Sequence, residues 1–395
     1  MKVSQGLDMN KMSVGLSRFL YLINFLLIFS LFISKGGLVR IFSYINIVAL
    51  MYFYVSDYVV YKKIPHIHKV LLIPVTYVLL DMLAMQQISF ANEYRKIILA
   101  TFFGIALYWI AEVDHLRRGF ILNSIILLIV IYIAFQFVSI LMLDKPYGTT
   151  KNPHYLALYS VFAILMGTFY FYEVTTKIRF IVPVSLIFLV GLVLYTSSRP
   201  AWIALFLASL VSIFFLKEKV RNVAIALIIL LPVVLFFTNI GDFGNRLSDL
   251  LMHISTEERV TIWRDTWAMQ MTSTYSEWCF GHGITSFEED FKRFSTYHLQ
   301  GNDFTMPHNS VLEVLHATGL VGLSLFFLIY FYITRELIGV INKSHKYRRI
   351  GILLLSILIV NFTMGLITVK WFTHFNSYVL AGIMGLLLFF KRIRR

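Results

Sequence analysis

The sequence predicts an all-α, polytopic membrane protein with about 12 transmembrane helices and one large hydrophilic loop. Two features of the composition support this prediction. The 395 residues are 58% hydrophobic and only 14% charged, which leaves too little polar surface for a soluble protein. The apolar residues also gather in runs that are long enough to cross a bilayer as helices. The single cysteine, Cys279, excludes an intramolecular disulfide framework.

The first apolar run, Leu16 to Ser34, follows basic residues and is about 19 residues long, which exceeds the apolar core of a cleaved signal peptide. No A-x-A-like cleavage site follows it, so we expect a retained helix. The twelve predicted helices lie near Leu16–Ser34, Val39–Tyr61, Val70–Met85, Ile97–Val113, Phe120–Leu143, His154–Tyr172, Phe180–Tyr195, Ala201–Leu216, Val223–Thr238, Ser310–Thr334, Ile350–Ile367 and Ser377–Phe390.

The basic residues predict which side of the membrane each loop occupies. The net charge is +14, but Lys and Arg sit in short clusters between apolar runs, which is typical of topology signals and not of a nucleic-acid partner. The side that holds both termini carries 22 Lys and Arg, and the other side carries 13. Both termini are therefore expected in the cytoplasm and the long loop on the opposite face, which is the periplasm if the chain lies in the inner membrane of a Gram-negative bacterium.

This topology divides the chain into three parts. Residues 1–238 hold the first nine predicted transmembrane helices, residues 239–307 form the large periplasmic loop, and residues 308–395 hold the last three helices. The loop contains an apolar stripe at helical spacing, which predicts an amphipathic helix with its tryptophans at the membrane interface. The stripe consists of Val260, Trp263, Trp267 and Met271.

The loop ends in the run PHNSVLEVL, where a proline precedes a predicted helix. Ser310 and Glu313 have the S-x-x-E spacing of a capping box, so Ser310 is expected to cap this helix. His308 would then lie just ahead of a helix N-terminus, where the dipole opposes protonation and leaves the imidazole able to accept a proton. A hydrogen-bonded, purely structural histidine is the alternative interpretation.

Arg199 lies in the run TSSRPAWIAL, at a short outward turn between two predicted helices. It either reaches towards lipid headgroups or clamps a phosphate-bearing lipid, because a guanidinium matches phosphate oxygens bidentately. Arg259 and Arg264 in the loop allow the same two interpretations. Asp81 lies within the third predicted helix, and no role is assigned to it.

The remaining histidines give no pattern of metal ligands. His282 lies between two glycines, while His316 and His374 lie in apolar surroundings, and we interpret these two as structural. No H-E-x-x-H, Walker or G-x-S-x-G pattern is present, so the sequence gives no positive support for a metal, a nucleotide cofactor or serine-hydrolase chemistry.

Three segments together resemble the O-antigen ligase (WaaL) family, within the superfamily of O-antigen ligases and Wzy polymerases. They are the outward turn at Arg199, the loop sequence ERVTIWRDTWAM followed by GHGITSF, and the run PHNSVLEVLHATGLVGL. The segment GTTKNPHYLALY also resembles the N-P-N-type start of the sixth helix of this family, with His154 in place of the more usual asparagine.

The resemblance implies a GT-C-like helical bundle and a metal-independent glycosyltransferase without a cofactor. Its donor would be a glycan linked to undecaprenyl diphosphate and its acceptor the lipid A core, with membrane lipids around the protein. It implies catalytic roles for His308, Arg259 and Arg199, the arginines binding the diphosphate and the histidine activating the acceptor. We take Arg264, Asn309, Glu313 and His154 as secondary candidates for substrate binding, although the capping role predicted for Glu313 would explain that residue by itself.

Ligation of O-antigen polysaccharide to the lipid A core is the function that we expect. A polymerase that uses a second lipid-linked repeat unit as acceptor is the nearest alternative. A lipid-glycan flippase or transporter would instead place charged residues inside the bundle, and a non-catalytic scaffold would tolerate loss of His308 or Arg259.

Overall fold

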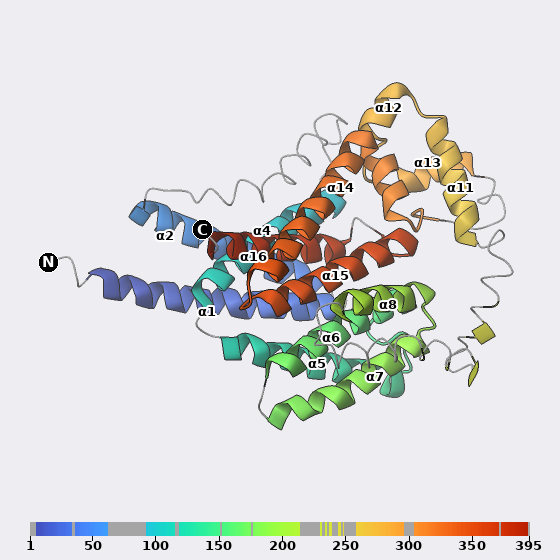
Figure 1. Ribbon diagram of the computed structural model, residues 1–395. Helices are drawn as coiled ribbons and strands as arrows, with labels where there is room; N and C mark the ends of the chain where they lie inside the picture. Colours follow the sequence, from blue (N-terminus) through green and yellow to red (C-terminus); the bar gives the residue numbers. More distant parts are fainter. Residues whose placement is uncertain are drawn as a thin grey trace. The chain divides into compact units, whose positions relative to one another are not determined.

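The computed structural model describes residues 5–33, 36–61, 92–114, 118–150, 152–174, 177–213, 230, 234, 237–238, 244–245, 248, 258–295, 304–370 and 373–393. All regular structure in these residues is helical (Figure 1). The main α-helices are α1 (Gln5–Phe32), α2 (Gly36–Tyr61), α4 (Asn92–Asp114), α5 (Arg118–Phe137), α6 (Pro153–Glu173), α7 (Ile181–Tyr195), α8 (Arg199–Ile213), α11 (Glu258–Met271), α12 (Tyr275–Phe280), α13 (Phe287–Phe294), α14 (Ser310–Lys343), α15 (Arg348–Ile367) and α16 (His374–Ile393). A π-helical turn, Val138–Met142, extends α5, and a 3-10 turn, Lys177–Phe180, precedes α7.

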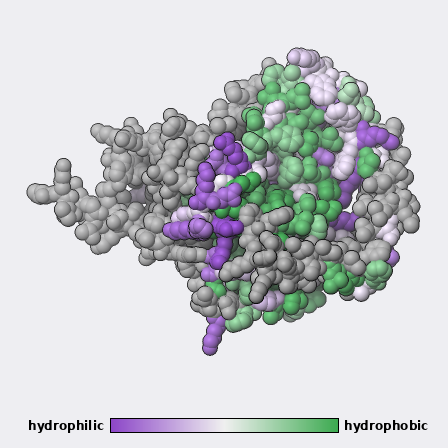
Figure 2. Space-filling view, in the orientation of Figure 1, coloured by the Kyte–Doolittle hydropathy of each residue, from purple (hydrophilic) through white to green (hydrophobic). Residues whose placement is uncertain are grey.

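The all-α prediction is confirmed, and ten of the twelve predicted runs coincide with helices of the described residues. The run at residues 70–85, with Asp81, and most of the run at residues 223–238 lie outside these residues. Four of the described helices are long and apolar enough to cross a membrane, and several shorter ones are also apolar. Apolar side chains cover much of the coloured surface in Figure 2, as a lipid-facing protein requires. The count of about 12 spans stays a prediction.

The chain forms two compact units, residues 1–135 with 372–395 and residues 136–371. In the first unit, α16 packs closely on α4 through small residues. A Cβ atom at Gly385 would lie 2.0 Å from the carbonyl oxygen of Gly104, and one at Gly104 would lie 2.4 Å from that of Ala381. Such contacts between backbones are typical of helices that associate within membranes. The predicted division into residues 1–238, 239–307 and 308–395 follows the topology and stays a prediction.

The second unit contains all the predicted site residues. Here α6 packs against α7, α8 and α15, and α14 packs against α15. The helices of the hydrophilic loop, α11, α12 and α13, gather at one end of α14 (Figure 1). At the far end of α6, Arg349 Nη1 of α15 donates to Glu173 Oε1 at 3.1 Å and to the Tyr172 carbonyl at 3.0 Å.

The amphipathic helix predicted in the loop is present as α11, and the face that it buries against the protein is not the tryptophan stripe, whose place at the membrane interface stays a prediction. Trp267 and Met271 are 48% and 60% exposed. The buried face is instead formed by Ile262, Thr266, Met269 and Gln270. The reason is the neighbouring helix: Phe287 and Phe291 of α13 form a small core with Ile262 and Met269, which turns the tryptophan stripe outwards.

The capping box predicted at Ser310 and Glu313 is wrong. Asn309 caps α14, because its side-chain oxygen accepts hydrogen bonds from the backbone N–H groups of Val311 at 2.9 Å and Leu312 at 3.2 Å. Its extended backbone, with φ −149° and ψ 113°, is the usual conformation of a cap. Ser310 is already helical, and its buried hydroxyl has no hydrogen-bond partner within the described residues.

Candidate active site

His154 is held on both sides of its ring. Its Nδ1 lies 2.9 Å from Ser198 Oγ, and its Nε2 lies 3.3 Å from Arg259 Nη2. A guanidinium can only donate, so Nε2 accepts and the proton is on Nδ1, which donates to the serine hydroxyl. His154 therefore links three segments, α6, the turn before α8, and α11. With both nitrogens engaged, it orients Arg259 and is not placed to act as a base.

His308 is fixed differently, with one nitrogen left for chemistry. Its Nδ1 lies 3.2 Å from the carbonyl oxygen of Thr368, at the end of α15. Because a carbonyl only accepts, the proton is on Nδ1 and the lone pair is on Nε2. The backbone of His308 has a φ of 53°, a left-handed conformation that is uncommon outside glycine and costs about 1–3 kcal/mol. The cap at Asn309 and the bond to Thr368 hold it there.

The surroundings of His308 keep its imidazole neutral. Burial is the main cause that lowers the pKa of His308, and the positive charge of Arg259 lowers it further. The Thr368 carbonyl and Glu258 act in the opposite direction but do not reverse the shift. The neutral state expected from the helix dipole is thus explained chiefly by burial. A neutral imidazole with a free Nε2 can accept a proton from a hydroxyl group.

The three residues predicted to be catalytic converge around His154, which was predicted to bind substrate. His154 is close enough to interact electrostatically with Arg259, His308 and Arg199. The four residues come from separate parts of the chain. His154 lies in the first turn of α6, Arg259 in α11, His308 in the segment before α14, and Arg199 is the first residue of α8. Helices α7 and α8 are separated only by residues 196–198, as expected for the short turn at Arg199.

Three helix N-termini meet at this cluster, those of α6, α8 and α14. The sequence NPH starts α6, because the Asn152 side chain accepts from the His154 backbone N–H at 2.8 Å and Pro153 occupies the first turn. Ser198 starts α8, because its carbonyl accepts from Ala201 N at 3.0 Å. Most first-turn N–H groups of these helices are capped or absent at prolines, but the helix N-termini still carry partial positive charge, so together with two arginines they favour an anionic group, above all a phosphate.

The other predicted residues lie at or beyond the edge of this cluster. The side chain of Arg264 is 75% exposed and lies 3.7 Å from Asp265, so the structure does not bring it to His308. Asn309 is occupied as the cap of α14. Glu313 is buried in α14, 5% exposed, and interacts electrostatically with Tyr155 of α6, which follows His154.

Two groups in this site were not found from the sequence, Ser198 and the Thr368 carbonyl. Serines and backbone carbonyls carry no distinctive pattern, and Thr368 lies sixty residues from His308. A second histidine cluster, at His282, Asp290 and His316, was also missed, because its members are far apart in the chain.

The comparisons with known proteins bear on the region that carries these residues. No curated protein matched the chain. Residues 184–327 match the family described as O-antigen ligase. This segment runs from α7 to the middle of α14 and includes Arg199, Arg259 and His308, while His154 lies outside it. The resemblance seen in the sequence is therefore confirmed: in residues 184–327 this chain is similar to the O-antigen ligases, a family of membrane glycosyl-transfer enzymes.

Proposed function

We propose that the chain is an O-antigen ligase, which transfers a polysaccharide from undecaprenyl diphosphate to a sugar of the lipid A core. The observation that carries this proposal is the convergence of Arg199, Arg259 and a neutral His308 at three helix N-termini, within the segment that matches the family. The proposed topology puts the site at the periplasmic face of the inner membrane and both termini in the cytoplasm.

The donor diphosphate is assigned to the two arginines. A lipid diphosphate leaves readily when the charge that develops on its oxygens is neutralised. Two guanidinium groups supply this charge bidentately, and the N-termini of α6 and α8 add the partial positive charge of their dipoles. This arrangement lets the transfer proceed without a metal ion at the diphosphate. His154 contributes by holding Arg259 at 3.3 Å from its Nε2.

His308 is assigned to the acceptor. Its Nε2 takes the proton from an acceptor hydroxyl as that oxygen attacks the anomeric carbon of the donor. The new glycosidic C–O bond forms while the bond from the anomeric carbon to the diphosphate oxygen breaks, and undecaprenyl diphosphate leaves. General base catalysis of this kind contributes about 10²- to 10⁴-fold in rate.

The remaining predicted residues are assigned smaller parts. Glu313, buried beside the first turn of α6, is proposed to lie behind the substrate pocket. Arg264 is exposed and is proposed to contact substrate only at its outer part. Asn309 acts through the conformation of His308, because it caps the helix that follows.

A reconstitution with two acceptors tests the reaction. The full-length protein is purified in detergent and given a lipid-linked O-antigen donor, with either lipid A core or a second lipid-linked repeat unit as acceptor. We expect a product on the lipid A core that carries the donor glycan. A product formed only on the second lipid-linked unit would replace the ligase with the polymerase, and no product on either acceptor would reject glycosyl transfer.

A matched set of variants tests the site. Arg199→Ala, Arg259→Ala and His308→Ala are introduced into a strain that lacks its own ligase, with the protein level monitored. We expect loss of capped core in all three. The control is Arg293→Ala, an exposed arginine that forms an ion pair with Glu289 on α13 and is 71% exposed. Normal capping by any of the three site variants would remove that residue from the site.

A further inference from the structure

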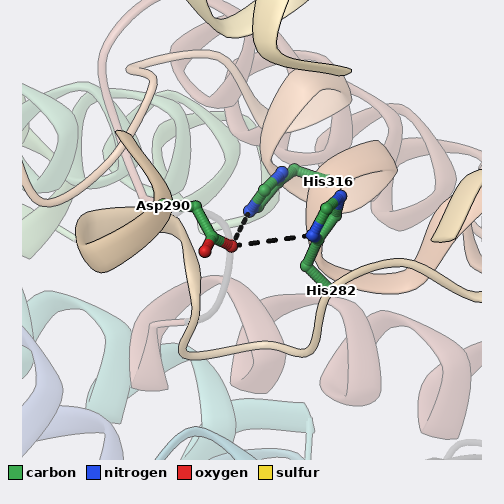
Figure 3. Close-up of side chains that lie close together, drawn as sticks. All are labelled: His282, Asp290 and His316. Atoms are coloured by element: carbon green, nitrogen blue, oxygen red, sulfur yellow. Dashed lines mark ion pairs between the residues drawn. The ribbon is translucent and has the colours of Figure 1, made fainter. Parts of the chain in front are cut away.

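A second cluster of ionisable side chains lies beside α14, the helix that directly follows His308. His316 of α14, His282 of the loop before α13, and Asp290 of α13 point towards one another (Figure 3). Asp290 Oδ2 lies 3.2 Å from His316 Nε2 and 3.7 Å from His282 Nδ1. Glu277 Oε1 is also 3.7 Å from His282 Nδ1. The reaction proposed above uses none of these groups.

The backbone builds this cluster through a break in α14. Gly319, with φ 63° and ψ −166°, interrupts the helix. Backbone carbonyls just before the break pair with the loop: His282 N donates to the His316 carbonyl at 2.8 Å, and Gly283 N donates to that of Ala317 at 3.0 Å. A Cβ at Gly281 would lie 2.4 Å from the backbone of Ala317, so only glycine allows this approach. The two imidazoles are thus placed by backbone contacts.

The spacing of the donor atoms suits a small divalent cation. A tetrahedral zinc ion about 2.0–2.1 Å from each nitrogen or oxygen ligand spaces the ligand atoms about 3.3 Å apart. The distances of 3.2 Å and 3.7 Å around Asp290 Oδ2 are close to this value. Two imidazoles and a carboxylate form a common zinc-binding set, and Glu277 supplies a further carboxylate beside it.

The carboxylate oxygen at the centre of the cluster lacks a well-oriented donor. Asp290 Oδ2 is buried, and no hydrogen bond of good geometry reaches it from the described residues, although His316 Nε2 lies 3.2 Å away. A bound cation would satisfy this oxygen.

We propose that His282, His316 and Asp290, with Glu277 beside them, bind a divalent metal ion of the zinc type. The ion would fasten α13 and the loop before it to α14, and it would have a structural role. The imidazoles are stacked, with ring centroids 4.4 Å apart and planes at 10°, so binding tilts one ring to bring both lone pairs towards the ion. Glu277 lies in α12, and only residues 272–274 separate α12 from α11. An ion bound beside Glu277 would therefore also restrain α11, the helix that carries Arg259.

Metal analysis of the full chain tests the proposal. The protein is purified in detergent without a polyhistidine tag, stripped with a chelator, and titrated with Zn²⁺ or Co²⁺. We expect saturable binding of about one ion per chain, and Co²⁺ absorption bands typical of tetrahedral coordination. Absence of stoichiometric Zn²⁺ and Co²⁺ binding by the wild-type protein would overturn the proposal without touching the proposed ligase activity.

Variants assign the ion to this cluster. Asp290→Asn keeps the shape of the side chain but removes its charge, and His282→Gln removes a nitrogen ligand. Both are expected to weaken Zn²⁺ binding at least tenfold, whereas His345→Gln, at an exposed histidine, should bind as the wild type does. Because Zn²⁺ binds the folded chain, it should also raise the Tm of the wild type and of His345→Gln only. Equal binding by Asp290→Asn and wild type would place the ion elsewhere and reject the site.

Discussion

The two histidine clusters at the start of α14 have similar side chains and opposite surroundings. His308 shares its surroundings with Arg259 and with His154, which itself interacts with Arg199. His316, about two turns further along, faces Asp290 and stacks on His282, which has Glu277 nearby. Positive neighbours and helix N-termini attract an anion, whereas carboxylates attract a cation. The charges around a histidine, and not the histidine itself, therefore indicate its chemistry.

The largest expected effect is on catalysis at the first cluster. His308→Ala removes the proton acceptor, and transfer to the lipid A core is expected to fall by about 10²- to 10⁴-fold. The rate is measured with purified protein and saturating lipid-linked donor. The Tm should change little, because the ring is only half-buried. A rate within threefold of the wild type would show that His308 takes no proton, and the two clusters would then not differ in catalytic role.

The second cluster should respond in the opposite way. With free Zn²⁺ at about 100 times its Kd, an ion that binds only the folded protein stabilises it by about 2.7 kcal/mol. Asp290→Asn should lose this Zn²⁺-dependent stabilisation, read as a shift in Tm with and without chelator. Transfer activity at a temperature well below the Tm is expected to stay within tenfold of the wild type. A loss of activity as large as that of His308→Ala would mean that the two clusters work as one site.

A smaller effect is expected from the cap that holds His308. Asn309→Ala removes the acceptor for two backbone N–H groups of α14 and should cost about 1 kcal/mol of stability. Because the cap also holds the left-handed backbone of His308, activity should fall with it. Asn309→Asp, which keeps the acceptor oxygen, should restore both. Ser310→Ala is the matched control, since its hydroxyl does not cap the helix; greater damage from that change would contradict the assignment of the cap.

The smallest effect concerns pH. The pKa of His308 is lowered from the ordinary histidine value of about 6.5, so the active neutral form persists below that pH. Activity should be lost as the pH falls through this lowered pKa. Glu258 raises the pKa of His308, so Glu258→Gln should move the acidic limb of the pH profile to still lower pH. Glu289→Gln, at an exposed glutamate of α13, should leave the limb in place, and a shift towards higher pH in Glu258→Gln would contradict this electrostatic account.

The sequence predicted the described helices well, because the length and composition of an apolar run are enough to identify it as a helix. It also predicted that His308 precedes a helix and that Arg199 lies at a short turn, since the proline beside each of them is a local signal. It did not predict which of two adjacent polar residues, Asn309 or Ser310, caps α14, because both are good caps and the choice depends on backbone conformation.

Contacts between segments that are distant in the chain could not be predicted from the sequence. The apolar stripe with Trp267 and Met271 was visible in the sequence, but the face of α11 that packs on the protein was not, because the position of α13 decides which face is buried. The cluster of His282, Asp290 and His316 has no metal-ligand spacing, because the break at Gly319 and the glycines around His282 create it in three dimensions. The convergence at Arg199 and Arg259 was reached through the family resemblance and not through spacing.

The break at Gly319 also divides α14 into two parts with different surroundings, which bears on the depth of the proposed site. At 34 residues, α14 is about 51 Å long, which exceeds the hydrocarbon core of about 30 Å. Before the break, residues 313–319 are covered by protein. After it, large apolar side chains such as Leu320, Leu328 and Phe331 are 47%, 60% and 67% exposed, as on a surface that faces lipid. The segment beyond the break, about 36 Å long, suffices to cross the core. In the proposed topology, the part before the break, about 14 Å long, would then carry His308 out of the hydrocarbon core towards the headgroups, where the proposed lipid diphosphate and the acceptor sugar can meet.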